Sequence, residues 1–190
     1  NQKVVYYAHA GAGELHLRPI LNLKTKKGVQ DFRAITLAVA RLVKKYKGAL
    51  SGEHGDGIVR SEFIPIVVGE NNYKLFQDIK TLFDPNKIFN PGKIVDPLPM
   101  DQNLRTENKD TPIHKTVFDF SADHGLLRAA EKCNGAGQCR STLPTGAMCP
   151  SYRATLDEKH NTRGRANVLR EVLSQDKKPN AFDSKELKEV

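Results

Sequence analysis

The stretch from Asp96 to Thr116 constrains the fold of this chain most, because it is polar, contains three prolines and shows no apolar periodicity. A stretch of this kind contributes little to a packed core, so we interpret it as a linker at 99–118. The 190 residues then divide into a first domain at 1–98 and a second at 119–190. No apolar run reaches the roughly 20 residues that a membrane-spanning helix needs.

The first domain combines a β-hairpin pattern with amphipathic helices. Val4–Tyr7 and Leu15–Leu23 have the composition of strands and flank a glycine-containing turn. Apolar residues recur at helical spacing over Val29–Tyr46 and Asn72–Phe83, whereas Ile58–Val68 favours an extended segment. The order of these elements predicts an α+β fold, an antiparallel sheet with helices on one face.

The second domain is expected to be small and mainly α-helical, with helical patterns at Ala122–Lys132 and Arg163–Leu173. All three cysteines lie between these patterns, and their odd number argues against a secreted disulfide framework. We therefore expect metal ligation or free thiols in a reducing compartment.

The net charge of +8 suits nucleic acid, an acidic partner or an anionic substrate. Few aromatic residues accompany the second domain's arginines, so we expect no nucleic acid partner.

Two histidines, His9 and His16, flank the predicted hairpin turn, and strand pairing would bring their side chains together. Neutral imidazole is a common ligand for zinc and similar divalent metals, and Glu53 in the glycine-rich run 51–57 offers a third ligand. His54 next to it would remain free to act as a base. A three-ligand metal keeps a position open for a substrate hydroxyl or carboxylate. The alternative is that both histidines are ordinary strand residues and the glycines serve only the turns.

Three motifs occur in the order that is typical of the C-terminal portion of the FAD-linked oxidases related to D-lactate, glycolate and D-2-hydroxyglutarate dehydrogenases. They are His9–His16, Ser51–Gly57 and Phe89–Lys93. This resemblance implies FAD as cofactor, a small 2-hydroxy acid as substrate, a metal bound by the two histidines and the glutamate, and His54 as proton acceptor. The chain departs from the usual family pattern at Glu14 and Arg18.

The resemblance also extends to residues near the metal motif. Asn90 and Lys93 lie in a turn that in the family is close to the flavin, although the same turn is an ordinary helix-stop signal. Arg60 is a candidate for a charge-assisted contact with a substrate carboxylate. A solvated arginine is an equally good interpretation of that position.

The cysteines are spaced as Cys133, Cys139 and Cys149, and the last of them precedes a proline. The pattern resembles a ferredoxin-type motif, except that Ala136 stands where another cysteine is common. Three thiolates do not complete a [4Fe–4S] site, so we expect further ligands beyond Val190. Buried thiols and a zinc site are the alternatives, and the gap between the first two cysteines is longer than zinc sites commonly have.

The sequence thus predicts a fragment of a flavin- and iron–sulfur-dependent dehydrogenase that oxidises a D-2-hydroxy acid and passes electrons to an acceptor. Most contacts to FAD would come from a domain of the same polypeptide that these residues do not include. We expect a cytoplasmic location, or one peripheral to the inner membrane. The alternative function is a basic metal-binding interaction module without redox activity.

Overall fold

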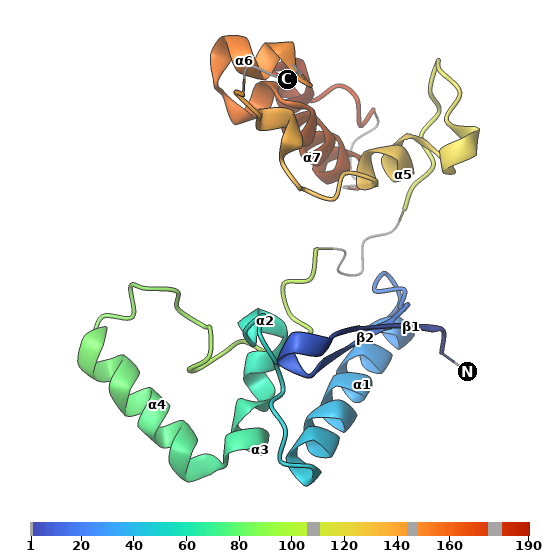
Figure 1. The fold of residues 1–190 in the computed structure, drawn as a ribbon. Coiled ribbons are helices and arrows are strands. Elements are labelled where there is room, and N and C mark those ends of the chain that lie inside the picture. Colours follow the sequence, from blue (N-terminus) through green and yellow to red (C-terminus); the bar gives the residue numbers. More distant parts are fainter. Residues whose placement is uncertain (1, 106–110, 144–147, 175–179) are drawn as a thin grey trace. The chain divides into compact units, whose positions relative to one another are not determined.

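The computed structural model describes residues 2–105, 111–143, 148–174 and 180–190 (Figure 1). The chain separates into two compact units, residues 1–108 and 109–190. The first unit is α+β, with a two-stranded antiparallel sheet and helices. The second unit consists of short helices. No helix among the described residues has the length and apolar character to cross a membrane.

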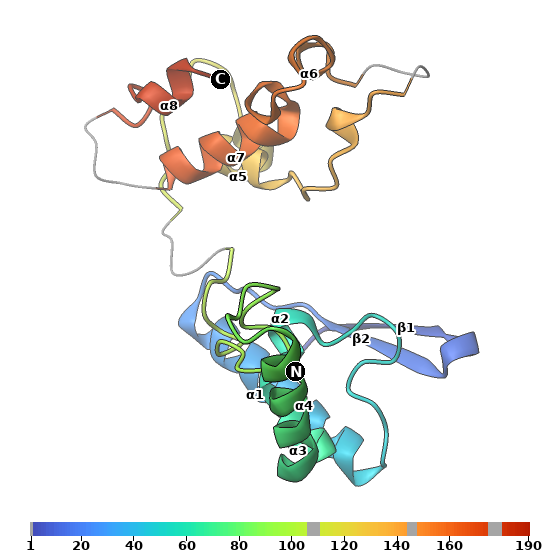
Figure 2. The same ribbon diagram turned by 90° about the vertical axis from the view of Figure 1, so that its left-hand side faces the viewer.

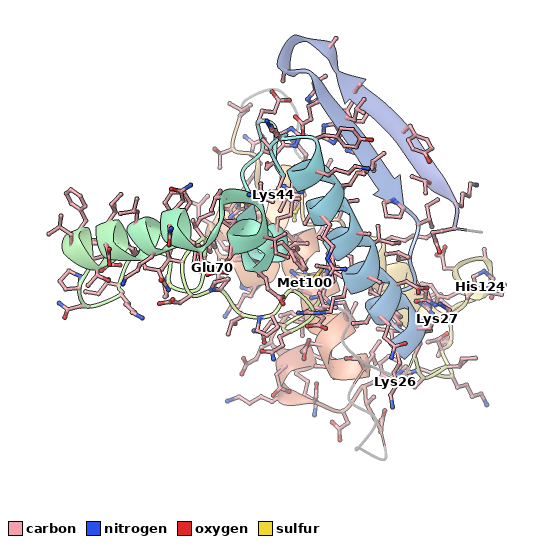
Figure 3. The ribbon with its side chains drawn as sticks, turned by 90° about the horizontal axis from the view of Figure 1, so that it is seen from below. Lys26, Lys27, Lys44, Glu70, Met100 and His124 are labelled. Atoms are coloured by element: carbon pink, nitrogen blue, oxygen red, sulfur yellow. The ribbon has the colours of Figure 1, made fainter. Side chains whose placement is uncertain are left out.

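The first unit begins with a hairpin and continues through helices of very different length (Figures 1 and 2). In chain order its elements are β1 (Val4–His9), the 3₁₀ turn η1 (Ala10–Ala12), β2 (Glu14–Pro19), α1 (Lys26–Lys45), α2 (Gly57–Arg60), η2 (Ser61–Phe63), α3 (Ile64–Val68) and α4 (Glu70–Phe83). The predicted hairpin and both predicted long helices are confirmed. The helix α1 runs along one face of the hairpin (Figure 3).

The helix α1 has a clear start and a favourable end. The hydroxyl of Thr25 caps it by accepting a hydrogen bond from the Gly28 backbone N–H at 3.0 Å. Lys44 and Lys45 lie in its last turn, where cations interact well with the helix dipole. Its apolar side packs into the small core that Ala40 forms with residues of other elements.

The segment 58–68 was expected to be extended, and this prediction is wrong. It forms α2, η2 and α3 in succession, and Pro65 occupies the first turn of α3, where a missing N–H costs nothing. A short apolar run fits a buried strand and a buried helix equally well, so periodicity could not separate them. Gly69, with φ of 87°, then ends α3 and allows α4 to begin.

Met100 and Asp101, from the start of the expected linker, pack on the first unit. Met100 is almost fully buried beside Ala40 and Phe63 (Figure 3). Its backbone N–H donates to Glu62 Oε2 at 2.8 Å, and Arg33 is paired with both Glu62 and Asp101. This packing places the first residues of the expected linker within the first unit.

The second unit is built around contacts between α5 and α7. Its elements are η3 (Ser121–Asp123), α5 (Leu126–Glu131), η4 (Gln138–Arg140), α6 (Pro150–Thr155), η5 (Glu158–His160), α7 (Thr162–Leu173) and α8 (Lys185–Lys188). Leu127 and Leu173 are buried, and His114 Nε2 lies 2.8 Å from the Leu173 carbonyl oxygen. Residues from 111 onward thus pack on this unit, although the sequence placed 111–118 in the linker.

Gly28 provides a test of how α1 is seated. A Cβ at this position would lie 1.9 Å from the Asn22 carbonyl oxygen, which is backbone and cannot rotate away. We expect Gly28→Ala to lower the free energy of unfolding by about 1–3 kcal/mol, the usual cost of overpacking. Urea unfolding followed by circular dichroism measures this. Gly48→Ala, whose Cβ would meet Val43 at an ordinary 3.6 Å, is the matched control and should be nearly neutral. Equal midpoints for both variants would contradict the packing of Gly28.

Candidate functional site

The candidate site is assembled first by the register of the hairpin. Tyr7 pairs with His16, and His9 pairs with Glu14 across the two strands. Alternate residues of a strand share a face, so these four side chains lie together on one face of the hairpin. The turn between the strands closes at Gly13, whose φ of 63° is a left-handed conformation that glycine adopts readily.

The loop that follows α1 brings two more polar side chains to this face. Ser51 Oγ donates to the Gly55 carbonyl oxygen at 2.9 Å, and an Arg60 Nη donates to the same oxygen at 2.7 Å, so the loop is folded back on itself. A Cβ on Gly52 would lie 2.9 Å from Glu14 Cδ, which shows how closely the loop approaches β2. This approach places Glu53 and His54 beside the hairpin histidines.

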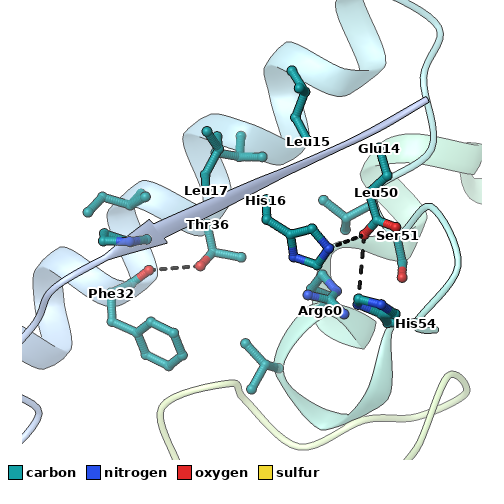
Figure 4. A pocket seen from close by; sticks show the side chains of 14 residues that line it. Glu14, Leu15, His16, Leu17, Phe32, Thr36, Leu50, Ser51, His54 and Arg60 are labelled. Carbon is teal, nitrogen blue, oxygen red and sulfur yellow. Dashed lines mark hydrogen bonds and ion pairs between the residues drawn. The ribbon is translucent and has the colours of Figure 1, made fainter. Parts of the chain in front are cut away.

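Four side chains then converge closely enough to hold one metal ion. They are His9, Glu14, His16 and His54, each with a ligand atom within 4.8 Å of the others. Glu14 Oε1 lies 3.6 Å from His16 Nε2 and 3.8 Å from His54 Nδ1 (Figure 4). The histidine rings are 4.7 Å apart for His9 and His16 and 4.9 Å apart for His16 and His54. The pairing of the two strands thus places the imidazole rings of His9 and His16 close together.

Glu53 lies at the edge of this group. Its Oε1 accepts a hydrogen bond from His9 Nδ1 and is 3.5 Å from His54 Nε2. The hydrogen bond to His9 is the main cause that lowers the pKa of Glu53 below its usual value. Glu53 is therefore a carboxylate held against the imidazoles, in contact with His9 but outside the four-residue group.

Glu14 is the residue that sequence reasoning missed. It was noted only as a departure from the family pattern, yet it is at the centre of the four side chains. The signal was available, because Glu14 precedes His16 by two residues on a predicted strand and must therefore point to the same face. Tyr7 was missed for the same reason. Its hydroxyl lies 2.6 Å from His9 Nε2, and its ring stacks on His16 at 4.5 Å.

A hollow of about 250 Å³ opens beside the histidines, between β2, α1 and the loop (Figure 4). Apolar side chains of α1 and β2 form much of its lining, together with Glu14, His16, His54 and Arg60. Arg60 is thus placed next to the candidate metal group. Burial raises the pKa of the neighbouring Asp56, although the positive charge of Arg60 opposes this effect.

Asn90 and Lys93 lie elsewhere in the first unit. They line a separate hollow of about 600 Å³ at the end of α4, mostly among apolar side chains such as Phe83 and Phe89. Neither residue lines the hollow beside His16. The backbone N–H of Ile94 donates to Ser61 Oγ at 3.0 Å, so the segment that carries them is fastened to η2.

The cysteines lie in the second unit, with Cys139 and Cys149 buried and Cys133 partly buried. Within the described ranges, no group of three or more potential metal ligands includes a cysteine. The Cys149 thiol donates to the His160 carbonyl oxygen at 3.5 Å. Hydrogen bonds from the Tyr152 backbone N–H and then from Thr162 lower the pKa of this thiol. The structure therefore does not bring the three thiols together as a complete site.

Comparison with known proteins gives one family and several relatives. The family described as FAD linked oxidases, C-terminal domain, matches residues 1–94. The chain is 39% identical over 174 residues to a D-2-hydroxyglutarate dehydrogenase of Pseudomonas putida, and 35% identical over 170 residues to one of Escherichia coli. Each alignment covers 88% of this chain but only 16% of the relative.

A D-lactate dehydrogenase of Archaeoglobus fulgidus is 36% identical over 86 residues, which is 45% of this chain and 18% of the relative. No solved structure matches the chain significantly. Because these alignments cover 88% of the chain, the similarity to the bacterial D-2-hydroxyglutarate dehydrogenases extends beyond residue 94 into the sequence of the second unit. Residues 1–94 of this chain are therefore similar to the C-terminal domains of FAD-linked oxidases.

Proposed function

We propose that this chain forms the substrate and metal side of an FAD-dependent dehydrogenase that oxidises a D-2-hydroxy acid. The observation that carries the proposal is the convergence of His9, Glu14, His16 and His54 beside a hollow that contains one arginine. The names of the bacterial relatives support a 2-hydroxy acid as substrate. Because the chain spans only 16% of these relatives, the rest of the active site would come from other parts of a longer polypeptide.

A divalent metal such as zinc fits the donor set of this group. Glu14 Oε2 and His16 Nε2 are buried and have no hydrogen-bond partner among the described residues. Buried polar atoms without partners are costly, and a metal bound by these atoms would remove that cost. When bound, such a metal would make a coordinated substrate hydroxyl easier to deprotonate. We assign His9, His16 and Glu53 as ligands, and the unpartnered Oε2 makes Glu14 a candidate for a further carboxylate ligand.

His54 has the position of a proton acceptor. It is about half exposed, lines the hollow and lies close to carboxylates of both Glu14 and Glu53. If His54 takes the hydroxyl proton, these carboxylates stabilise the imidazolium that results. Arg60 lines the same hollow and can bind the substrate carboxylate by charge-assisted hydrogen bonds.

FAD would be held mainly by another domain of the polypeptide and would accept the hydride. Asn90 and Lys93 contribute two polar groups at a mostly apolar hollow, which suits contact with one edge of a flavin ring. They are too few to bind the cofactor alone. The direct test is flavin absorbance and dye-linked oxidation of 2-hydroxy acids by the full polypeptide. A basic metal-binding module without redox activity would bind metal but show neither property.

The metal assignment predicts that His9→Ala and His16→Ala each lower metal content together with activity in the full polypeptide. Each ligand belongs to a small fixed set, so one loss weakens binding strongly. Elemental analysis of purified variants measures this. Glu53→Gln and Glu14→Gln, compared side by side, identify which carboxylate coordinates the metal. Full metal occupancy in both histidine variants would contradict the site.

The base assignment predicts a different result for His54→Gln. This variant should keep its metal but lose turnover by about 10² to 10⁴, the usual contribution of a general base. Steady-state rates together with metal content separate this role from that of a ligand. A rate loss below about threefold would mean that His54 is a bystander.

We also propose that the second unit belongs to an iron–sulfur segment that carries electrons to an acceptor. The support is the order of Cys133, Cys139 and Cys149-Pro150, which resembles a ferredoxin-type motif. The described residues alone do not assemble a cluster site, so we derive no electron-transfer step through them. Further ligands would come from other parts of the polypeptide.

Residues 1–190 alone should therefore purify without a stable cluster. In the full polypeptide, iron and sulfide should be present, and Cys133→Ser and Cys149→Ser should disturb different electron paramagnetic resonance signals. This difference is expected because the cysteine before proline often serves a second cluster. A brown, cluster-loaded protein made from these 190 residues would contradict the proposal.

A further inference from the structure

Arg18 continues the polar face of the hairpin beyond the candidate metal group. Glu14, His16 and Arg18 are alternate residues of β2, so their side chains leave the strand on the same face. Arg18 pairs with Val5 across the hairpin, two residues along from the Tyr7–His16 pair. The strand rise places its Cα about 7 Å from that of His16. A cation is therefore fixed at a short, defined distance from the imidazoles.

The guanidinium of Arg18 is also oriented by its neighbour on β1. Its Cζ lies over the Tyr7 ring, 5.2 Å from the centroid, a cation–π arrangement. Tyr7 in turn stacks on His16 and is hydrogen-bonded to His9. The contacts join Arg18 through one aromatic ring to two of the proposed metal ligands.

No carboxylate neutralises Arg18 in the described ranges. Arg33, by comparison, has two acidic partners, whereas no ion pair joins Arg18 to a described residue. The side chain is exposed and therefore accessible to a bound molecule. An oriented guanidinium without an acidic partner is a good binding group for a carboxylate, which it can hold by two parallel hydrogen bonds.

We propose that Arg18 binds the second carboxylate of a 2-hydroxy dicarboxylic acid and so selects dicarboxylates over monocarboxylates. The inference rests on the proposed function, since it needs the hydroxyl end of the substrate at the histidine group. In an extended five-carbon chain, the hydroxyl carbon and the far carboxyl carbon lie about 4 Å apart. With a hydrogen bond at the far end, that length spans the step from His16 to Arg18. A three-carbon hydroxy acid such as lactate has no group to offer Arg18.

Arg60 and Arg18 have separate roles in this arrangement. Arg60 lines the hollow beside His54 and is fastened to the Gly55 carbonyl oxygen, so it suits the carboxylate next to the hydroxyl carbon. Arg18 does not line that hollow. Two cations on different elements thus match two carboxylates of one substrate.

The test compares kcat/KM for 2-hydroxyglutarate and for 2-hydroxyvalerate, which has the same chain length without the second carboxylate. In the full polypeptide, Arg18→Gln should lower kcat/KM for 2-hydroxyglutarate by about 10- to 100-fold, as expected for the loss of a charged hydrogen bond. The value for 2-hydroxyvalerate should change by less than about twofold, and metal content should stay the same. Arg18→Lys should recover part of the loss because it keeps the charge.

Arg41→Gln removes an exposed arginine of α1 that lies outside the site and is the matched charge control; it should leave both values unchanged. An equal loss for both acids in Arg18→Gln, or no loss for the dicarboxylate, would overturn the role of Arg18. A wild-type enzyme that oxidises lactate as well as it oxidises 2-hydroxyglutarate would also overturn the selection. If the wild-type enzyme oxidises no 2-hydroxy acid, the proposed function itself fails, which is a distinguishable result.

Discussion

The backbone pairing of β1 with β2 is the constraint on which the site depends. Because side chains alternate between the faces of a strand, a register shift of one residue would send His16 and Glu14 to the opposite face from His9. The observed register instead pairs Tyr7 with His16 and His9 with Glu14. A glycine in the left-handed region at the turn permits this pairing within a very short connection. One local hairpin thus positions most of the groups that could bind a metal.

The rest of the site reaches this hairpin through a loop whose approach depends on the absence of a side chain at Gly52. The loop leads directly into α2 and η2, and η2 carries Glu62, which is paired with Arg33 of α1. The position of His54 is therefore coupled to the packing of α1 and not only to the loop itself. In a two-stranded sheet with little core of its own, this coupling supplies rigidity that the hairpin lacks.

Features that depend on residues close together in the sequence could be predicted from it, whereas features that depend on contacts between distant residues could not. The hairpin, the two long helices and the meeting of His9 with His16 follow from local periodicity, and Glu14 would have followed had the same alternation been applied to it. The segment 58–68 could not be assigned, because its apolar run suits either a strand or a helix. Met100 and Asp101 were assigned to a linker because their partners, Glu62 and Arg33, are far away in the sequence. A pattern of neighbouring residues in the sequence cannot reveal contacts between residues that lie so far apart along the chain.

The cysteines illustrate a different limit. Their spacing in the sequence indicates which residues could be ligands. A metal site also requires the ligand atoms to lie close together, and among the described residues the cysteines form no such group. Cys149 is instead satisfied locally, by the His160 carbonyl oxygen and by donors of α6 and α7. The hairpin site is the opposite case, since His16 Nε2 and Glu14 Oε2 are buried without a hydrogen-bond partner among the described residues. His16 Nε2 and Glu14 Oε2 belong to a group of four potential metal ligands, whereas no such group among the described residues includes a cysteine. Within the described ranges, the first unit alone therefore presents a nearly complete metal site.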